Sequence, residues 1–151
     1  MDLNKKVTAF MKKVVFVELG TDMKKVADLM AKEETEVLVV RNKGKVEGII
    51  TEMDLFYMFK NYAFPELQKR PGDVKDIKLD KAMMSKTSKD FMSACQLYGV
   101  HPCLMVGEDD TLENTIRIMV AGGEFHLLVI GGKGEVTGTV SPLDVIEAFV
   151  K

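Results

Sequence analysis

An internal repeat constrains this chain more than any other feature of its sequence. When the sequence is shifted by ninety residues, positions 14–56 align with positions 104–146 without a gap. Identical residues occur at Thr21/Thr111, Ala31/Ala121, Glu34/Glu124, Leu38/Leu128, Val39/Val129, Lys43/Lys133, Gly44/Gly134, Val46/Val136, Gly48/Gly138 and Asp54/Asp144. Self-similarity at a fixed spacing marks repeated supersecondary structure, so the fold must contain two copies of one unit.

Each copy has the pattern of a β-α-β-β-α unit. A short apolar run, "VVFV" or "LMV", predicts a buried strand, and a few residues later Thr21 or Thr111 stands where a helix cap belongs. An amphipathic helix, the apolar strands "VLVV" and "LLVI", a turn with Gly, another strand and a closing helix complete the unit. One copy of about sixty residues has a thin core. We therefore expect an α/β (α+β) fold in which the two copies pack as a pseudo-twofold module.

The segments outside the aligned copies set the expected domain boundaries. We predict one repeat over residues 1–60, a polar, proline-broken linker over 61–78, and a second repeat over 79–151. The second repeat contains an insertion at about 85–101, because a longer stretch separates its lead-in segment from its first strand. This insertion could cover a ligand, block a ligand site or form a dimer contact, since loop decoration on a rigid scaffold often carries function.

Composition and charge argue against several classes of function. The formal net charge is −2, so the chain lacks the basic surplus that is typical of nucleic-acid-binding proteins. No apolar run approaches membrane-spanning length, and the N-terminal stretch "MDLNKKVTAFMKKV" lacks the apolar region of a secretory signal. We therefore expect a soluble cytoplasmic protein that binds neither nucleic acid nor membrane.

Cysteine and histidine are too few and too scattered to form a recognised metal site. The candidate ligands Cys95, Cys103, His101 and His126 do not match a zinc spacing, and a Cys95–Cys103 disulfide has no secretory signal to support it. The sequence also has no P-loop and no nucleophile–base set that satisfies the requirements of an active site. We therefore expect no metal site, no catalytic site and no enzymatic activity.

A short polar motif closes each copy: "GIITEMD" in the first and "GTVSPLD" in the second. In one interpretation the motif caps a helix, with Thr51 and Ser141 as N-caps and with Asp54 and Asp144 as acidic third residues. Pro142 then suits the first helical position. In the other interpretation the motif is a ligand site that the chain uses twice. The two are compatible, because a cap places the Asp at the N-terminal end of its helix.

The ordered repeat resembles a tandem pair of CBS domains, the modules named after cystathionine β-synthase. The resemblance rests on the doubled β-α-β-β-α order, the segments "NKGKVEGII" and "GKGEVTGTV", the lead-ins "KVTAFM" and "LDKAMM", and the closing motifs, and it covers nearly the whole chain. Such pairs hold adenosine-containing ligands (AMP, ADP, ATP or S-adenosylmethionine) in the cleft between repeats and commonly form disc-like dimers. The resemblance therefore implies a stand-alone regulatory module that needs no cofactor and acts on a separate effector protein.

The resemblance also implies which residues contact the ligand. The motif Asp takes the ribose hydroxyls, the preceding Thr or Ser takes phosphate or ribose, and residues that enter the apolar strand line the base pocket. The implied ligand-binding residues are Asp144, Ser141, His126, Phe125, Thr21, Asp54, Thr51, Val37 and Thr111, with Thr35, Glu36 and Leu127 beside them. The chemistry is reasonable, because a carboxylate accepts two hydrogen bonds from a cis-diol and a helix N-terminus suits a phosphate.

The two copies differ beside their motifs. The second has His126 where the first has Glu36, and a glutamate disfavours a nearby phosphate. We therefore favour the site at Asp144, although His126 could also be a half-buried polar residue without a ligand. The alternative function is a structural or dimerisation module with no ligand in its cleft. The apolar closing helices "LFYMF" and "VIEAFV" predict a homodimer, the commonest closed assembly.

Overall fold

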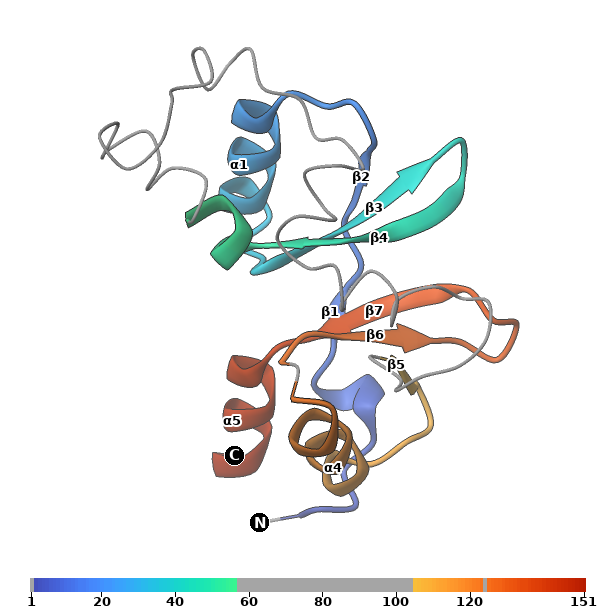
Figure 1. The fold of residues 1–151 in the computed structure, drawn as a ribbon. Helices are drawn as coiled ribbons and strands as arrows, with labels where there is room; N and C mark the ends of the chain where they lie inside the picture. Colours follow the sequence, from blue (N-terminus) through green and yellow to red (C-terminus); the bar gives the residue numbers. More distant parts are fainter. Residues whose placement is uncertain (1, 57–104, 124) are drawn as a thin grey trace. The chain divides into compact units, whose positions relative to one another are not determined.

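A computed structural model describes residues 2–56, 105–123 and 125–151 of the chain (Figure 1). The predicted linker at 61–78 and the predicted insertion at 85–101 lie outside the described residues, so the domain boundaries stay a prediction. Within the described residues, no helix combines the length and the hydropathy that a bilayer crossing requires.

The chain divides into two compact units, and the division does not follow the order of the sequence. One unit contains the described residues 15–56, which form the first copy of the repeat. The other contains residues 2–14 together with 105–123 and 125–151, so the N-terminal segment belongs with the second copy. Each copy forms the expected β-α-β-β-α unit, which confirms the α/β (α+β) fold class. The pseudo-twofold packing of the two copies stays a prediction.

The first copy is a three-stranded sheet covered by a helix. Its elements are β2 (Phe16–Glu18), α1 (Met23–Lys32), β3 (Val37–Asn42), β4 (Lys45–Thr51) and the start of a further helix at residues 52–56. Strand β3 lies in the centre, parallel to β2 and antiparallel to β4. The parallel pair requires the α1 crossover, because a hairpin can join only antiparallel strands.

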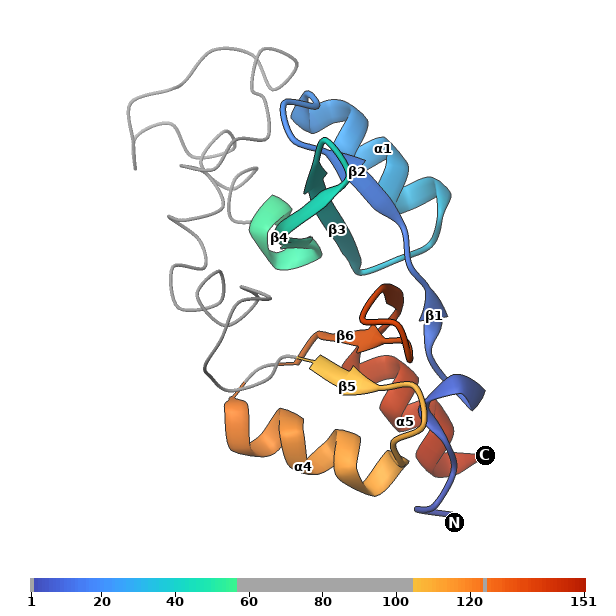
Figure 2. The same ribbon diagram turned by 90° about the vertical axis from the view of Figure 1, so that its right-hand side faces the viewer.

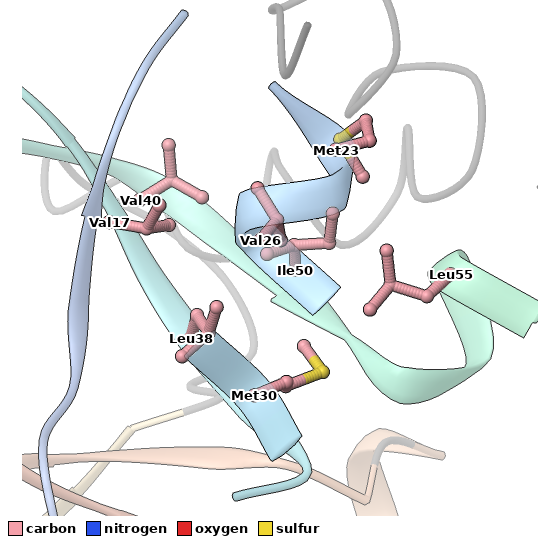
Figure 3. Close-up of a cluster of buried hydrophobic side chains, with 8 residues drawn as sticks. All are labelled: Val17, Met23, Val26, Met30, Leu38, Val40, Ile50 and Leu55. Atoms are coloured by element: carbon pink, nitrogen blue, oxygen red, sulfur yellow. The ribbon is translucent and has the colours of Figure 1, made fainter. Parts of the chain in front are cut away.

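The core of the first copy lies between α1 and the sheet (Figure 3). Helix α1 buries Met23, Val26 and Met30, which recur at helical spacing and form one apolar face. The cluster is completed by Val17, Leu38, Val40, Ile50 and Leu55. Burying a side chain of this size stabilises the fold by about 1.5–3 kcal/mol, so these residues hold the unit together.

The second copy is a four-stranded sheet of order β1-β7-β6-β5. Its elements are η1 (Val7–Ala9), β1 (Lys12–Lys13), β5 (Met105–Gly107), α4 (Leu112–Gly122), β6 (Leu127–Ile130), β7 (Val136–Val140) and α5 (Pro142–Val150). Helices α4 and α5 cover the same face of the sheet (Figures 1 and 2). The fourth strand is therefore supplied by residues that lie far from the others in the sequence.

Residues 2–13, which we call the N-terminal strap, complete the second copy (Figure 2). Strand β1 pairs antiparallel with β7, with Lys12 opposite Thr139. Val7 is fully buried, and its backbone N–H donates to the carbonyl oxygen of Asp110 at 2.9 Å. A Cβ on Gly138 would lie 2.7 Å from the Lys12 carbonyl oxygen, so the close approach of the strap requires glycine there.

The first helix of each copy begins with a different kind of cap. The prediction is confirmed for Thr111, whose hydroxyl accepts a hydrogen bond from a backbone N–H three residues later. It is wrong for Thr21, because the N-cap of α1 is Asp22, whose carboxylate accepts from the Lys25 N–H at 2.9 Å. The Thr21 hydroxyl instead donates to the carbonyl oxygen of Glu18 at 2.7 Å. An ionised carboxylate accepts more strongly than a hydroxyl, so Asp22 takes the cap.

The two hairpins also differ, although their sequences align. Lys43 and Gly44 form the β3–β4 turn. Both have positive φ (50° and 81°), as a two-residue hairpin turn of type I′ requires. The β6–β7 loop is longer: it spans residues 131–135, and a hydrogen bond from the Gly131 N–H to the Glu135 carbonyl oxygen closes it. As a result, the cross-strand partners of the two ladders differ by one residue between the copies.

Candidate functional site

The second closing motif forms a complete capping box at the start of α5. The Ser141 hydroxyl accepts from the Asp144 N–H at 3.4 Å, and the Ser141 N–H donates to Asp144 Oδ2 at 2.7 Å. Pro142 occupies the first helical turn, as the sequence predicts. The Asp144 side chain is only 6% exposed. The capping interpretation is therefore confirmed here, but it uses only the Oδ2 atom of the carboxylate.

The first closing motif has the same local geometry. The Thr51 N–H donates to Asp54 Oδ2 at 2.9 Å, and the Thr51 hydroxyl donates to the same oxygen at 3.1 Å. The Asp54 N–H donates back to the Thr51 hydroxyl at 3.4 Å. Asp54 is half-buried rather than buried. Capping again occupies a single carboxylate oxygen, Oδ2, so this motif too can hold a ligand through its other oxygen.

Asp144 differs from Asp54 in having a cation beside it. Lys12 of the N-terminal strap places its Nζ 3.5 Å from Asp144 Oδ1, and the Lys12 side chain is 38% exposed. Among the residues that the structure describes, no lysine or arginine forms an ion pair with Asp54. The two carboxylates therefore share a backbone geometry but differ in electrostatic surroundings.

A pocket of about 300 Å³ lies beside Asp144, within the second copy. The strap forms one side of it and α5 forms the other. Its lining residues are Lys5, Ala9, Phe10, Met11, Lys12, Asp144, Glu147, Ala148 and Lys151. The pocket therefore combines a buried carboxylate, three lysines and an apolar wall, and its formal charge is positive because three lysines oppose two acids.

Two of the pocket lysines are held by short contacts to α5. Lys5 Nζ donates to the carbonyl oxygen of Ala148 at 2.9 Å, which ties the strap to the C-terminal turn of the helix. Lys151 Nζ donates to Glu147 Oε2 at 2.9 Å. This hydrogen bond and the charge of Lys151 lower the pKa of Glu147 below its ordinary value, and the charge of Lys12 lowers the pKa further. Glu147 is therefore already paired, and Asp144 faces Lys12.

The structure brings together some of the sequence-predicted site residues of the first copy and separates others. Val37, which is buried, is the cross-strand partner of Thr51, and Asp54 is hydrogen-bonded to Thr51. Thr21 follows the C-terminal end of β2. Because β2 is parallel to β3, Thr21 lies at the opposite end of this sheet from Val37. Within this copy, Thr21 and the Thr51–Asp54 motif therefore lie at opposite ends of the sheet.

The second copy has the same arrangement. Ser141 and Asp144 lie together, whereas Thr111 follows β5 at the opposite sheet end from the motif. Phe125, which is 59% exposed, and the half-buried His126 directly precede β6. Within the described structure, the pocket beside Asp144 is not lined by these two residues or by Thr111. Their contacts with a ligand stay predictions.

Lys5 and Lys12 line the pocket, but they were not predicted as site residues from the sequence. Both precede the first copy, and the motif that they accompany lies in the second copy, so sequence proximity gave no indication. The available signal was Gly138, a glycine inside a predicted strand, which marks a close approach of another backbone segment. That backbone is the N-terminal strap.

Comparison with known proteins identifies the family. The model of the CBS domain family matches residues 7–61 and 89–151. A search of proteins with curated descriptions found no match. Solved structures, in contrast, include many similar folds.

Three solved structures illustrate this similarity. A conserved protein from Pyrococcus horikoshii is 21% identical with a TM-score of 0.65, and the match covers 100% of this chain and 96% of that one. CBSX2, solved in complex with AMP, is 18% identical with a TM-score of 0.58, and the match covers 97% of this chain and 96% of that one. A CBS-domain-containing protein from Thermotoga maritima is 20% identical with a TM-score of 0.59, and the match covers 97% of this chain and 95% of that one.

At these identities the solved structures establish the fold. The family model adds the sequence pattern, which it matches in both copies and over most of the chain. The doubled β-α-β-β-α units and the capped closing helices agree with that match. The chain therefore belongs to the CBS-domain family and is a tandem pair of CBS domains.

Proposed function

We propose that the protein is a regulatory module that senses an adenosine-containing ligand, with the pocket beside Asp144 as its principal site. The observation that carries the proposal is the state of the Asp144 carboxylate. It is buried, its Oδ2 is fixed by the Ser141 N–H, and its Oδ1 is on the side of Lys12, another residue that lines the pocket. A pocket of about 300 Å³ is at the lower end of the range for small-molecule sites.

The chemistry of the pocket suits a nucleoside. A fixed carboxylate oxygen is a strong acceptor for a ribose cis-diol, because charged acceptors make shorter and stronger hydrogen bonds than neutral ones. The apolar side chains of Phe10 and Met11 line the same pocket and offer a surface for a base. The AMP complex of CBSX2, a protein with the same fold, supports an adenine nucleotide as the ligand class.

We further propose a second, weaker site at Thr51 and Asp54, with Val37 beside it. The geometry of the motif supports it, since one carboxylate oxygen of Asp54 is fixed by Thr51 in the same way. The site lacks a cation among the described residues, so an anionic ligand gains less there. His126, Phe125, Thr21 and Thr111 keep their proposed roles as additional contacts, which ligand-bound structures will test.

A thermal-shift screen tests the sensing function. We expect AMP, ADP, ATP or S-adenosylmethionine to raise the melting temperature, because a ligand that binds only the native state stabilises it in proportion to its occupancy. Guanosine monophosphate is the control for specificity toward the base. No shift with any adenosine compound at millimolar concentration would contradict the proposal and favour the structural alternative.

One observation also favours a dimerisation function for the last helix. Helix α5 exposes large apolar side chains: Leu143 at 45%, Ile146 at 57%, Phe149 at 43% and Val150 at 74%. They recur on one helical face, which is typical of an interface. We propose that this face packs against a second copy of the chain, and that the assembled module acts on a separate effector protein.

Light scattering of the parent and of Ile146→Asp tests the assembly. We expect a dimer for the parent and a monomer for the variant, because a charge at an apolar interface is costly to bury. Val120→Asp is the matched control, since Val120 is 76% exposed and belongs to a different helix, α4. A monomeric parent, or equal masses for both variants, would contradict the proposed contact.

A further inference from the structure

Lys12 is held in place by the pairing of its backbone in a sheet, in addition to the contact that its side chain makes with Asp144. Lys12 belongs to β1, where it is paired with Thr139 of β7. The strand can approach β7 because residue 138 is glycine, with Met11 and the Lys12 carbonyl oxygen occupying the space that a Cβ would need. A cation on a paired strand is presented to Asp144 with less loss of conformational freedom than one on a free chain end.

The contact between Lys12 and Asp144 leaves hydrogen-bonding capacity on both groups. At 3.5 Å the pair is beyond the usual hydrogen-bond range of about 2.7–3.2 Å. Lys5 and Lys151 instead hold partners on α5 at 2.9 Å. An ammonium group has three donors and a carboxylate oxygen accepts more than one hydrogen bond. A ligand that enters between them can therefore use both, with a hydroxyl donating to Asp144 and an anion accepting from Lys12.

The charge of the pocket then determines which ligand fits. A phosphate close to Asp144 alone would be repelled, and a cationic group close to Lys12 would be repelled in turn. A nucleotide avoids both conflicts, because its diol is neutral and its phosphate is anionic. S-adenosylmethionine carries a sulfonium at the carbon where AMP carries its phosphate, and that charge would face Lys12.

We propose that Lys12 is a specificity residue of the Asp144 pocket: it binds the phosphate of an adenine nucleotide and makes the pocket discriminate against S-adenosylmethionine. The inference rests on the proposed function, which says only that the pocket takes an adenosine-containing ligand. Within that class, Lys12 of the N-terminal strap makes the pocket prefer the ligands that carry a phosphate.

Calorimetric titration of AMP, adenosine and S-adenosylmethionine into the full chain tests the assignment. The variants are Lys12→Met, which keeps the length of the side chain without its charge, and Lys12→Arg, which keeps the charge. For Lys12→Met we expect AMP affinity to fall about ten- to a hundredfold, the effect of one charged hydrogen bond. Adenosine affinity should change less than about threefold, since adenosine has no phosphate to lose a partner. Lys12→Arg should retain most of the AMP affinity.

Lys13→Met is the matched control, because Lys13 belongs to the same strand and is exposed to solvent. We expect it to bind all three compounds as the parent does. If Lys12→Met melts below the temperature of the titration, Lys12→Gln, which is polar and uncharged, takes its place in the comparison.

The outcomes separate this inference from the proposed function. If the parent binds adenosine and AMP, and Lys12→Met leaves the ratio of the two affinities unchanged, the role of Lys12 is wrong and the adenosine site stands. If the parent binds S-adenosylmethionine more tightly than AMP, the role of Lys12 is again wrong and the adenosine site stands. If the parent binds none of the three compounds, the proposed function and this inference both fail.

Discussion

The Thr51–Asp54 and Ser141–Asp144 motifs place one sequence pattern in two different surroundings. In both, a hydroxyl residue caps a helix and fixes one oxygen of the Asp carboxylate. Only Asp144 is buried, and only Asp144 has a lysine at ion-pair distance among the described residues. The cap is therefore encoded within the motif and recurs with it. The charge and the pocket come from the N-terminal strap, which a local motif cannot specify.

The central-strand leucines of the two copies, in contrast, are equally buried. Leu38 and Leu128 occupy the same repeat position in the central strands β3 and β6, and their exposed fractions are 0% and 1%. We expect Leu38→Ala and Leu128→Ala each to lower the free energy of unfolding by about 2–5 kcal/mol through lost burial and the cavity left behind. Urea denaturation measures this, with Val120→Ala at an exposed position as the control. A loss below 1 kcal/mol (less than a core truncation of this kind costs) at either leucine would show that the copies are not equivalently packed.

The ligand sites should differ where the cores do not. We expect Asp144→Ala to lower AMP affinity about ten- to a hundredfold, the cost of a lost charged hydrogen bond, and Asp54→Ala to lower it less. Asp144→Asn keeps the shape of the side chain and separates loss of charge from loss of folding. Calorimetry and melting curves are measured together on all variants.

Two results would decide against this assignment. Equal AMP affinity in the parent and in Asp144→Ala would remove the ribose contact and leave only the capping role. A larger loss at Asp54 than at Asp144 would move the principal site to the first copy. In either case the CBS fold stands, because it rests on the family match and the topology.

The helix caps provide a smaller test of the same comparison. Thr111 caps α4 through its hydroxyl, whereas the aligned Thr21 caps nothing and donates to a carbonyl oxygen. We expect Thr111→Ala to cost about 1 kcal/mol of stability, the usual value for a lost cap, and Thr21→Ala to cost less. Thr111→Ser, which keeps the hydroxyl, should restore most of the loss. Equal losses for the two alanine variants would contradict the assignment of caps.

Local features of this fold could be predicted from the sequence because they depend on residues close together in the chain. The order of elements in both copies, the Ser141 capping box and the apolar face of α1 follow from spacing, from hydroxyl chemistry and from periodicity. The Thr21 cap failed for a local reason as well. Asp22 follows directly and is a stronger acceptor, and it aligns with Leu112, which cannot cap, so the repeat pattern does not indicate it.

Features that depend on distant segments could not be predicted. The pairing of β1 with β7 joins residues at opposite ends of the chain; Gly138 marks a close approach of some backbone segment but does not identify β1 as that segment. The position of Lys12 beside Asp144 follows only from that pairing. The hairpin register is a third case, since the cross-strand partners shift by one residue between the copies although the aligned sequences have the same length.

The smallest expected difference between the copies is a response to acid. The pKa of Asp22 lies below its ordinary value of 3.8, chiefly because its carboxylate accepts the backbone N–H of Lys25, with the charge of Lys25 contributing. A carboxyl group whose pKa is lower in the folded state contributes stability that is present above its unfolded pKa and is lost as pH falls through the folded value. The α1 cap should therefore weaken below about pH 4, the ordinary range of an aspartate, whereas the Thr111 cap of α4 has no charge to lose.

Amide hydrogen exchange between pH 2.5 and pH 5 (a range that spans the ordinary aspartate pKa), corrected for intrinsic rates, measures the two helix starts separately. We expect protection at the Lys25 amide to fall at the acid end, relative to protection at the Asn114 amide, which Thr111 caps. In Asp22→Asn, whose amide oxygen still accepts but does not ionise, the difference between the two amides should no longer depend on pH. An acid response at Lys25 that persists in Asp22→Asn would have to arise from another carboxyl group, and the contrast between a titrating and a non-titrating cap would be lost.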